Sequence, residues 1–220
     1  MCTPSPLALI AGAGPGIGRA TALKFFREGF RVAVLARPGE TFETIRSELQ
    51  GHEALVLGVD VADRQALGQA LQSVQESMGF PEVLVWNASQ GIPGLITPIE
   101  DRVLLKDLEA NLFAPLDAIR WVLPEMRRVG RGTLLITGGG LALDPKPVLA
   151  SSSLGKALQR HLALLLDGEL REGGIHVATL TVCGFVQAGT PLSPESVAEE
   201  LWNLHEQKPG DWKREKVLHA

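Results

Sequence analysis

Four glycines near the start of the sequence have the spacing of a phosphate-binding turn. Gly12, Gly14, Gly16 and Gly18 follow a short apolar run, and Ile17 begins a segment with helical periodicity. Glycine permits positive φ and a close approach of the backbone to a pyrophosphate, and the first turn of a helix offers free N–H groups. The position between a strand and a helix favours a dinucleotide site over the alternative, a merely tight turn.

The residue that ends the next predicted strand indicates which dinucleotide would bind. A carboxylate at this point would accept a hydrogen bond from the ribose 2′-hydroxyl of NAD. This sequence has Ala36 followed by Arg37 instead. A guanidinium suits the 2′-phosphate of NADP, and such a charge-assisted hydrogen bond contributes roughly 1.5–3 kcal/mol. NADP is therefore favoured over NAD; the alternative is that Arg37 is only a solvated residue at a strand end.

Apolar runs and segments with helical spacing alternate along the chain and would position these residues. Strands buried on both faces are predicted over residues 7–13, 31–36, 54–59, 83–86, 133–137 and 175–182, with a short final strand at 212–218. Helices are predicted over residues 17–28, 41–49, 64–78, 100–128, 151–172 and 194–207. Alternating strands and helices form right-handed crossovers and a parallel sheet covered on both faces. We expect one α/β domain over residues 1–220, a Rossmann-like doubly wound parallel sheet of about seven strands flanked by helices.

Composition argues against several kinds of partner. The formal net charge is −4, which does not provide the basic footprint of nucleic-acid binding. No apolar run approaches the roughly 18 residues of a membrane-spanning helix, and the start Met1-Cys2-Thr3-Pro4 lacks the basic region of a signal peptide. Cys2 and Cys183 are too few for a disulfide framework, and no His/Cys/Asp cluster has metal-ligand spacing. We expect a cytoplasmic protein with no metal, nucleic-acid or membrane partner.

Several motifs together resemble the short-chain dehydrogenase/reductase family. The spacing of Gly12, Gly16 and Gly18 is similar to that of the family's glycine turn, and the resemblance extends from Leu7 to the C-terminus. Other matching positions are Asp60-Val61 after the third strand, Asn87-Ala88 after the fourth, Asn111 and Lys156 on long helices, and Gly184 and Val186 after the sixth strand. The resemblance implies that Asp60 and Val61 contact adenine, that Lys156 contacts ribose and that Gly184 and Val186 contact nicotinamide. With the glycine turn, the predicted cofactor-binding residues are Gly12, Gly14, Gly16, Ile17, Gly18, Arg37, Asp60, Val61, Asn87, Ala88, Lys156, Gly184 and Val186.

The sequence departs from this family in its acid/base chemistry. In the family, a Tyr hydroxyl transfers the substrate proton while a hydride moves to or from nicotinamide, and a Ser polarises the carbonyl. The Tyr position, four residues before Lys156, holds Ser152, the expected Ser position holds Gly139, and the sequence contains no Tyr. A serine hydroxyl has a pKa several units above the phenol value of about 10, so Lys156 cannot readily poise it near neutrality.

The catalytic candidates that remain are Lys156, Ser152 and Asn111. The resemblance implies that Asn111 anchors a proton-relay water, and a water relayed by Lys156 or Ser152 could serve as a non-standard proton donor. The structural alternatives are that Lys156 is a solvated lysine and that serines 151 to 153 cap the helix N-terminus. Cys183, which replaces the Pro of the family's turn, is interpreted as a buried, inert thiol.

Two hypotheses for function follow. The first is a divergent NADP-dependent oxidoreductase with impaired or non-standard acid/base chemistry, acting on an unidentified carbonyl, alcohol or alkene. The second is a non-catalytic NADP(H)-binding sensor or a structural partner of an active paralogue. Helices 100–128 and 151–172 carry more apolar residues than one sheet can cover, and the corresponding helices form the family's main subunit interface. We therefore expect a homodimer or homotetramer; the alternative is that these helices pack only on the sheet and on each other.

Overall fold

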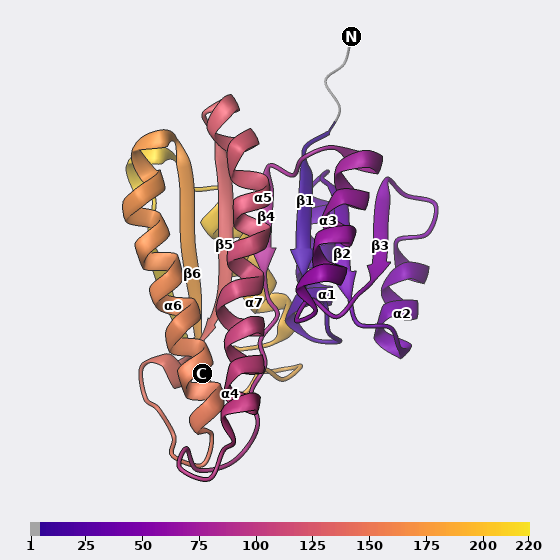
Figure 1. Ribbon diagram of the computed structural model, residues 1–220. Helices are drawn as coiled ribbons and strands as arrows, with labels where there is room; N and C mark the ends of the chain where they lie inside the picture. Colours follow the sequence, from indigo (N-terminus) through magenta and orange to yellow (C-terminus); the bar gives the residue numbers. More distant parts are fainter. Residues whose placement is uncertain (1–4) are drawn as a thin grey trace.

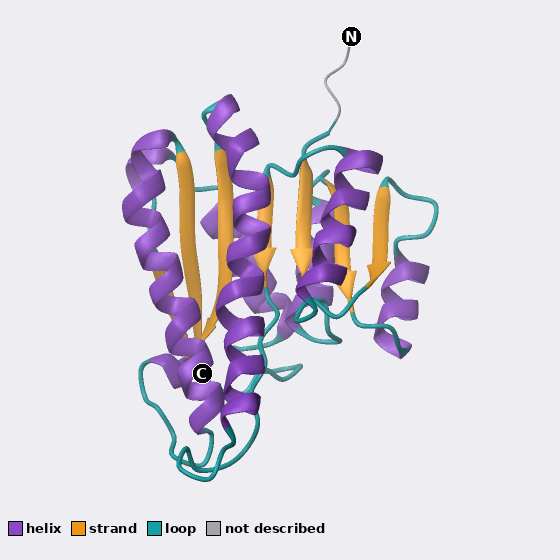
Figure 2. Cartoon of the chain, viewed as in Figure 1, coloured by secondary structure: helices purple, strands orange, loops and turns teal. Residues whose placement is uncertain are grey.

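A seven-stranded, fully parallel sheet is the centre of the computed structural model, which describes residues 5–220. Residues 1–4 lie outside the described residues. The predictions that concern Cys2 and the absence of a signal peptide therefore fall outside them too. The strands are β1 (Leu7–Ala11), β2 (Arg31–Ala36), β3 (Ala54–Gly58), β4 (Val83–Trp86), β5 (Gly132–Gly139), β6 (Ile175–Cys183) and β7 (Glu215–His219). Their order is β3-β2-β1-β4-β5-β6-β7, which confirms the predicted fold class. The strand arrows visible in Figure 2 all point the same way.

Helices cover both faces of this sheet, with α5 and α6 in front of it in Figure 1. Leu7 and Leu9 of β1 pack toward α3, α5 and α6, whereas Ala8 and Ile10 pack toward α1, α2 and α7. The apolar runs therefore bury alternate side chains on opposite faces. The helices are α1 (Ile17–Arg27), α2 (Glu40–Glu48), α3 (Arg64–Met78), α4 (Asp101–Leu108), α5 (Ala114–Val129), α6 (Ala150–Leu170) and α7 (Pro194–His205). Short helical turns are η2 (Gly140–Ala142), η3 (Arg171–Gly173) and η4 (Pro209–Asp211).

Two predicted elements differ in the structure. The helix predicted over residues 100–128 is divided between α4 and α5 by a π-helical turn, η1 (Glu109–Phe113), at the position of Asn111. The strand predicted over residues 54–59 was expected to be buried on both faces. β3 is instead only partly buried, because it forms one edge of the sheet.

The strand order changes direction between β1 and β4: β2 and β3 follow on one side of β1, and β4 to β7 follow on the other. The connections after β1 and β4 therefore lie on either side of a crevice. β1 pairs with β2 on one side and with β4 on the other, so their connections leave the same edge in different directions. Crevices at such switch points are the usual ligand sites of open α/β sheets. The long loops before α4 and before α6 extend beyond this edge and lie together at the bottom of Figure 1. Gly94 joins them, because its N–H donates to the Val148 carbonyl at 2.8 Å and its carbonyl accepts from the Ala150 N–H at 3.3 Å.

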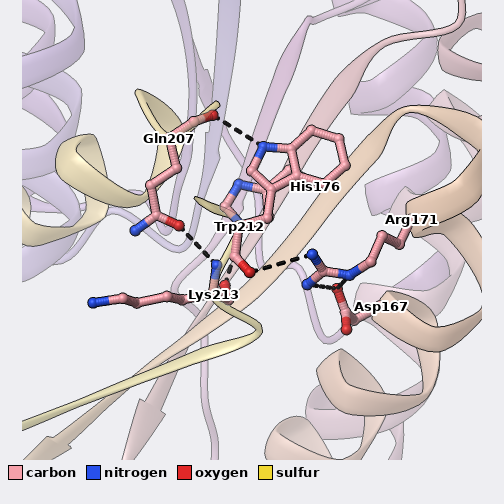
Figure 3. Close-up of polar contacts among 6 residues, drawn as sticks. All are labelled: Asp167, Arg171, His176, Gln207, Trp212 and Lys213. Atoms are coloured by element: carbon pink, nitrogen blue, oxygen red, sulfur yellow. Dashed lines mark hydrogen bonds and ion pairs between the residues drawn. The ribbon is translucent and has the colours of Figure 1, made fainter. Parts of the chain in front are cut away.

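The C-terminal segment is held against the sheet by the polar contacts drawn in Figure 3. The ring of Trp212 stacks on that of His176, with centroids 5.0 Å apart and an angle of 2° between the planes. The Trp212 indole N–H donates to the Gln207 carbonyl at 2.9 Å, and Arg171 donates to the Trp212 carbonyl at 3.2 Å. Asp167 in turn accepts from Arg171 at 2.7 Å. These contacts anchor the chain directly before β7.

Neither a membrane span nor a metal centre is found in the described part of the chain. No helix within residues 5–220 combines the length and apolar character needed to cross a bilayer. The same residues contain no group of three or more His, Cys, Asp or Glu side chains that could hold a metal ion.

Candidate functional site

A cavity of about 890 Å³ opens at the carboxyl ends of the central strands. All thirteen residues predicted from the sequence to bind a cofactor line this cavity: Gly12, Gly14, Gly16, Ile17, Gly18, Arg37, Asp60, Val61, Asn87, Ala88, Lys156, Gly184 and Val186. The fold therefore brings together residues from the start of α1 and the connections after β1, β2, β3, β4 and β6, together with Lys156 on α6. Thr137 and Gln90 also line the cavity and were not predicted.

The four glycines of the turn divide into two pairs. Gly12 has φ +91°, and a Cβ there would lie 2.4 Å from the Ala88 backbone N, while a Cβ on Gly18 would lie 2.6 Å from Ala13 Cα. The fold itself requires these two glycines. At Gly14 and Gly16, by contrast, a Cβ would meet no protein atom within 4 Å. The backbone at this second pair thus faces open space inside the cavity.

The N-terminus of α1 has the features of an anion site. Gly16 occupies the N-cap position without a side-chain hydrogen bond, and the first turn contains no acidic residue. The N–H groups of a first helical turn have no partner within the helix, and together with the helix dipole they attract phosphate. Asn87 keeps the turn in place, because its Nδ2 donates to the Gly12 carbonyl at 2.8 Å. This part of the cavity fits a pyrophosphate.

The far end of the cavity lies over β2 and β3. Arg37 lines it with an exposed side chain, and the neighbouring Thr41 adds a hydroxyl that was not predicted. Glu40 also lines this end, so the lining contains a carboxylate as well as the Arg37 guanidinium. The Asp60 carboxylate accepts from the Ala62 N–H at 3.1 Å and so shapes the loop after β3.

Lys156 reaches into the cavity from α6. Its Nζ donates to the Thr137 carbonyl at 2.9 Å and to Gln159 Oε1 at 3.0 Å. Burial of the ammonium lowers the pKa of Lys156 to about 8. The alternative of a fully solvated lysine is wrong. Within residues 5–220 these are its two acceptors, so one of three N–H groups is left for a ligand.

Asn111 lies behind the cavity wall and does not line it. The side chain is fully buried, with Nδ2 donating to the Gln90 carbonyl at 2.7 Å. Its Oδ1 accepts from the Gln90 N–H at 3.0 Å and from Ser89 Oγ at 3.2 Å. Asn111 therefore fixes the loop that follows β4.

The serines at the start of α6 do not cap the helix, contrary to the structural alternative considered above. The N-cap residue is Leu149, without a side-chain cap. Ser151 Oγ instead donates to the buried Asp107 carboxylate, and Ser153 Oγ donates to the Leu149 carbonyl at 2.9 Å. Ser151 Oγ also accepts from the Ile92 N–H at 3.1 Å, and Ser153 Oγ accepts from the Lys146 N–H at 3.2 Å, so both serines tie α6 to neighbouring loops. The helix begins at Ala150, one residue earlier than expected.

Ser152 packs against the loop after β4 and is absent from the cavity lining. A Cβ on Gly91 would lie only 2.4 Å from Ser152 Oγ, which shows how closely the two segments approach. Gly139 does line the cavity, and a Cβ there would lie 3.3 Å from Lys156 Cδ. The structure therefore brings Gly139 and Lys156 together and leaves Ser152 to one side.

Cys183 ends β6 next to the cavity. Its side chain is partly exposed, and a Cβ on Gly140 would lie 3.2 Å from its sulfur. Burial, followed by the charge of Glu215, raises the pKa of the Cys183 thiol. The interpretation of Cys183 as a buried thiol is wrong, because the side chain at the end of β6 is partly exposed. Its raised pKa keeps the thiol protonated at neutral pH, which agrees with an inert thiol.

Comparison with known proteins identifies the family. Residues 6–200 match the family model described as short chain dehydrogenase. The chain belongs to the short-chain dehydrogenase family. The resemblance inferred from the glycine turn and Lys156 is thus confirmed, as is the Rossmann-type fold that it implied.

Three similar proteins show the range of this short-chain dehydrogenase family. The oxidoreductase asL5 of Sarocladium schorii is 26% identical over 91% of this chain and 79% of its own length. The inactive hydroxysteroid dehydrogenase-like protein 1 of Pongo abelii is 24% identical over 79% of this chain, which spans 54% of that protein. A metagenomic short-chain oxidoreductase, solved in complex with NADP, is 26% identical with a TM-score of 0.87, covering 98% of this chain and 97% of its own.

Gln159 is the polar residue near Lys156 that sequence reasoning missed. It is fully buried on α6, and its Nε2 donates to the Ala88 carbonyl at 2.8 Å. The available signal was its spacing, because residues three apart on a helix lie on the same face and Lys156 was already a candidate.

Proposed function

We propose that this short-chain dehydrogenase is an NADP(H)-dependent oxidoreductase in which Lys156 replaces the absent Tyr as the proton donor. The carrying observation is that Lys156 lines the cavity with a pKa lowered to about 8. An acid works best when its pKa lies near the working pH. Ser152, the other candidate donor, is not part of the cavity wall.

The residues present fit the nucleotide. The uncapped N-terminus of α1 and the open space at Gly14 and Gly16 would hold the pyrophosphate. Arg37 would pair with the 2′-phosphate, which supports NADP over NAD, and the remaining N–H of Lys156 would bind ribose or substrate oxygen. The NADP complex of the similar metagenomic oxidoreductase supports the same choice.

In this proposal, NADPH, when bound, would supply a hydride for the carbonyl carbon of the substrate. The Lys156 ammonium donates a proton to the carbonyl oxygen, directly or through a water, and the neutral amine regains its proton from solvent. Gly139 provides no hydroxyl to polarise that carbonyl. Since positioned acid/base catalysis contributes about 10²- to 10⁴-fold, we expect slower turnover than with a full set of catalytic groups.

The test is NADPH consumption over a panel of aldehydes and ketones. Wild-type turnover that Lys156→Ala reduces at least tenfold would support the proposal. Lys106→Ala, an exposed lysine on α4, is the matched control and should retain full activity. Turnover that is unchanged in Lys156→Ala would refute the assignment of the donor.

The second candidate function is a non-catalytic NADP(H) sensor or a structural partner of an active paralogue. It is favoured by the absence of Tyr from the whole sequence and by Gly139 at the expected Ser position. The similar protein of Pongo abelii, which is named as inactive, provides a precedent within the family. Tight NADPH binding without turnover on any carbonyl would support this function over the first.

We also propose that the chain assembles as a homodimer or homotetramer through α4, α5 and α6. Exposed apolar side chains on these elements are Leu105 at 60%, Leu154 at 51% and Leu165 at 73% relative exposure. Sedimentation velocity at micromolar concentration should show an oligomer that Leu165→Glu dissociates. Val148→Glu, on a loop, is the control. A monomeric wild type would exclude this assembly.

A further inference from the structure

Gln159 is a fully buried polar side chain in an otherwise apolar part of α6. Leu162 and Ala163, which follow on the same helix, belong to the hydrophobic core. Burying an amide without hydrogen bonds costs several kcal/mol, on the order of 2–7, so its partners matter for the fold and for the site.

The Gln159 amide joins three separate segments. Its Oε1 accepts from Lys156 Nζ at 3.0 Å, and its Nε2 donates to the Ala88 carbonyl at 2.8 Å and to Asn111 Oδ1 at 3.4 Å. It therefore links α6 to the turn after β4 and to η1. Every polar group of the amide is in use.

These partners fix which way the amide faces. The two N–H groups of Nε2 have oxygen acceptors, and exchanging O and N would place Oε1 against the Ala88 carbonyl and Asn111 Oδ1. Two oxygens without a proton between them repel. The amide oxygen is therefore held toward Lys156, where it stabilises the ammonium.

Neutral oxygens are the partners of the Lys156 ammonium in the described part of the chain. The Thr137 carbonyl is fixed by β5, which leaves Gln159 as the one side-chain acceptor. The pKa of Lys156 is lowered by burial. No charged group bonds to Lys156 in residues 5–220. The titratable and charged groups on α6 and on the elements packed against it are Asp101, Arg102, Lys106, Asp107 and Glu109 on α4 and η1, Arg160, His161, Asp167 and Glu169 on α6, Arg171 and Glu172 on η3, His176 and Cys183 on β6, and Glu215 on β7, which pairs with Arg160.

We propose that Gln159 is a positioning residue for Lys156, a role that rests on the function proposed above. It holds Nζ at the cavity wall and stabilises its protonated form. Because the same amide binds Ala88 and Asn111, the position of Lys156 is tied to the loop after β4 that lines the cavity.

The first experiment measures the pKa of Lys156 directly in the nucleotide-free protein. The 13Cε resonance of Lys156, in protein labelled with 13C-lysine and assigned with Lys156→Arg, is followed as a function of pH. Gln159→Leu removes the acceptor and should lower the pKa by about 1 unit, whereas Gln159→Glu adds a carboxylate and should raise it by about 1 unit or more. Gln69→Leu, at an exposed position on α3, should cause no shift.

The second experiment measures NADPH affinity of wild type and Gln159→Leu by calorimetry. At about pH 6 both carry the ammonium and should bind equally; at about pH 8 the variant should bind about fivefold more weakly. A merely structural role would weaken binding by the same factor at both values. An equal loss at both pH values, or a Lys156 pKa unchanged in both variants, would overturn the proposal.

Failure of the proposed function gives a different result. A wild type that does not bind NADPH refutes the proposed function, while the resonance titration still tests Gln159 without any nucleotide. If Gln159→Leu fails to fold, Gln159→Glu provides the decisive shift, and an unshifted or lowered pKa in that variant counts against the proposal.

Discussion

Lys156 and Arg37 line one cavity, and both were predicted from the sequence as cofactor-binding residues. The environment of Lys156, however, could not be predicted. Lys156 was predicted from the resemblance, as the lysine on a long helix of the family, but its lowered pKa depends on its burial between α6 and β5. Burial of one atom depends on packing between distant segments, which local spacing does not encode. For Gln159 the spacing of three residues from Lys156 was a local signal, but its contacts with Asn111 and Ala88, 48 and 71 residues away in sequence, could not be read from spacing.

Arg37 carries the prediction for cofactor choice. Replacing Arg37 with Ala should weaken NADPH binding at least tenfold, because a charge-assisted pair with the 2′-phosphate is lost, while NADH affinity should hardly change. Calorimetric titration with both nucleotides measures this difference. Arg46→Ala, an exposed arginine on α2, is the control. Equal losses for NADPH and NADH would show that Arg37 does not contact the 2′-phosphate.

At the scale of elements, apolar periodicity predicted most strands and helices to within two residues. It failed at η1, where the sequence continues with ordinary helical spacing. The π-helical turn coincides with Asn111, whose buried amide bonds to Ser89 and Gln90 on a distant loop. Such turns arise from tertiary contacts and often occur near functional sites. The burial of β3 was overestimated, because the apolar run does not show that this strand lies at the edge of the sheet.

Gly155 allows α6 to approach η1, and this contact carries a prediction about stability. A Cβ at position 155 would lie 2.6 Å from Asn111 Nδ2, so Gly155→Ala should reduce the free energy of unfolding by about 1–3 kcal/mol. Gly168→Ala, on the same helix with open space around it, should increase it by about 0.5–1 kcal/mol. Urea denaturation measures both. A stabilising effect at position 155 would contradict the close packing.

At the scale of the whole molecule, the ring cluster under α7 makes stability depend on pH. His205 packs against Phe25, Phe30 and Trp202, and burial followed by the charge of His176 lowers its pKa to about 4. Burial likewise lowers the pKa of His176. Both side chains are therefore neutral in the folded state at a pH where the unfolded chain binds protons.

The sign of the effect follows from proton linkage. Between the unfolded pKa of about 6.5 and the folded value of about 4, the unfolded state binds the extra proton, so stability falls as pH decreases. His205 alone should reduce the free energy of unfolding by about 2 kcal/mol between about pH 7 and about pH 5. Urea denaturation at the two pH values tests this, and His205→Phe should flatten the dependence. His161→Phe, at an exposed position, should not.

The backbone pairing at Gly94 has a consequence for how the two loops beyond the sheet edge move. Gly94 bonds to both Val148 and Ala150, so the loop before α4 and the loop before α6 share one pair of hydrogen bonds. Neither loop can leave its place without breaking the bonds of the other. Their motion should therefore be cooperative: the two loops open as one unit with one free energy of opening, and a ligand that orders either loop shifts the population of both.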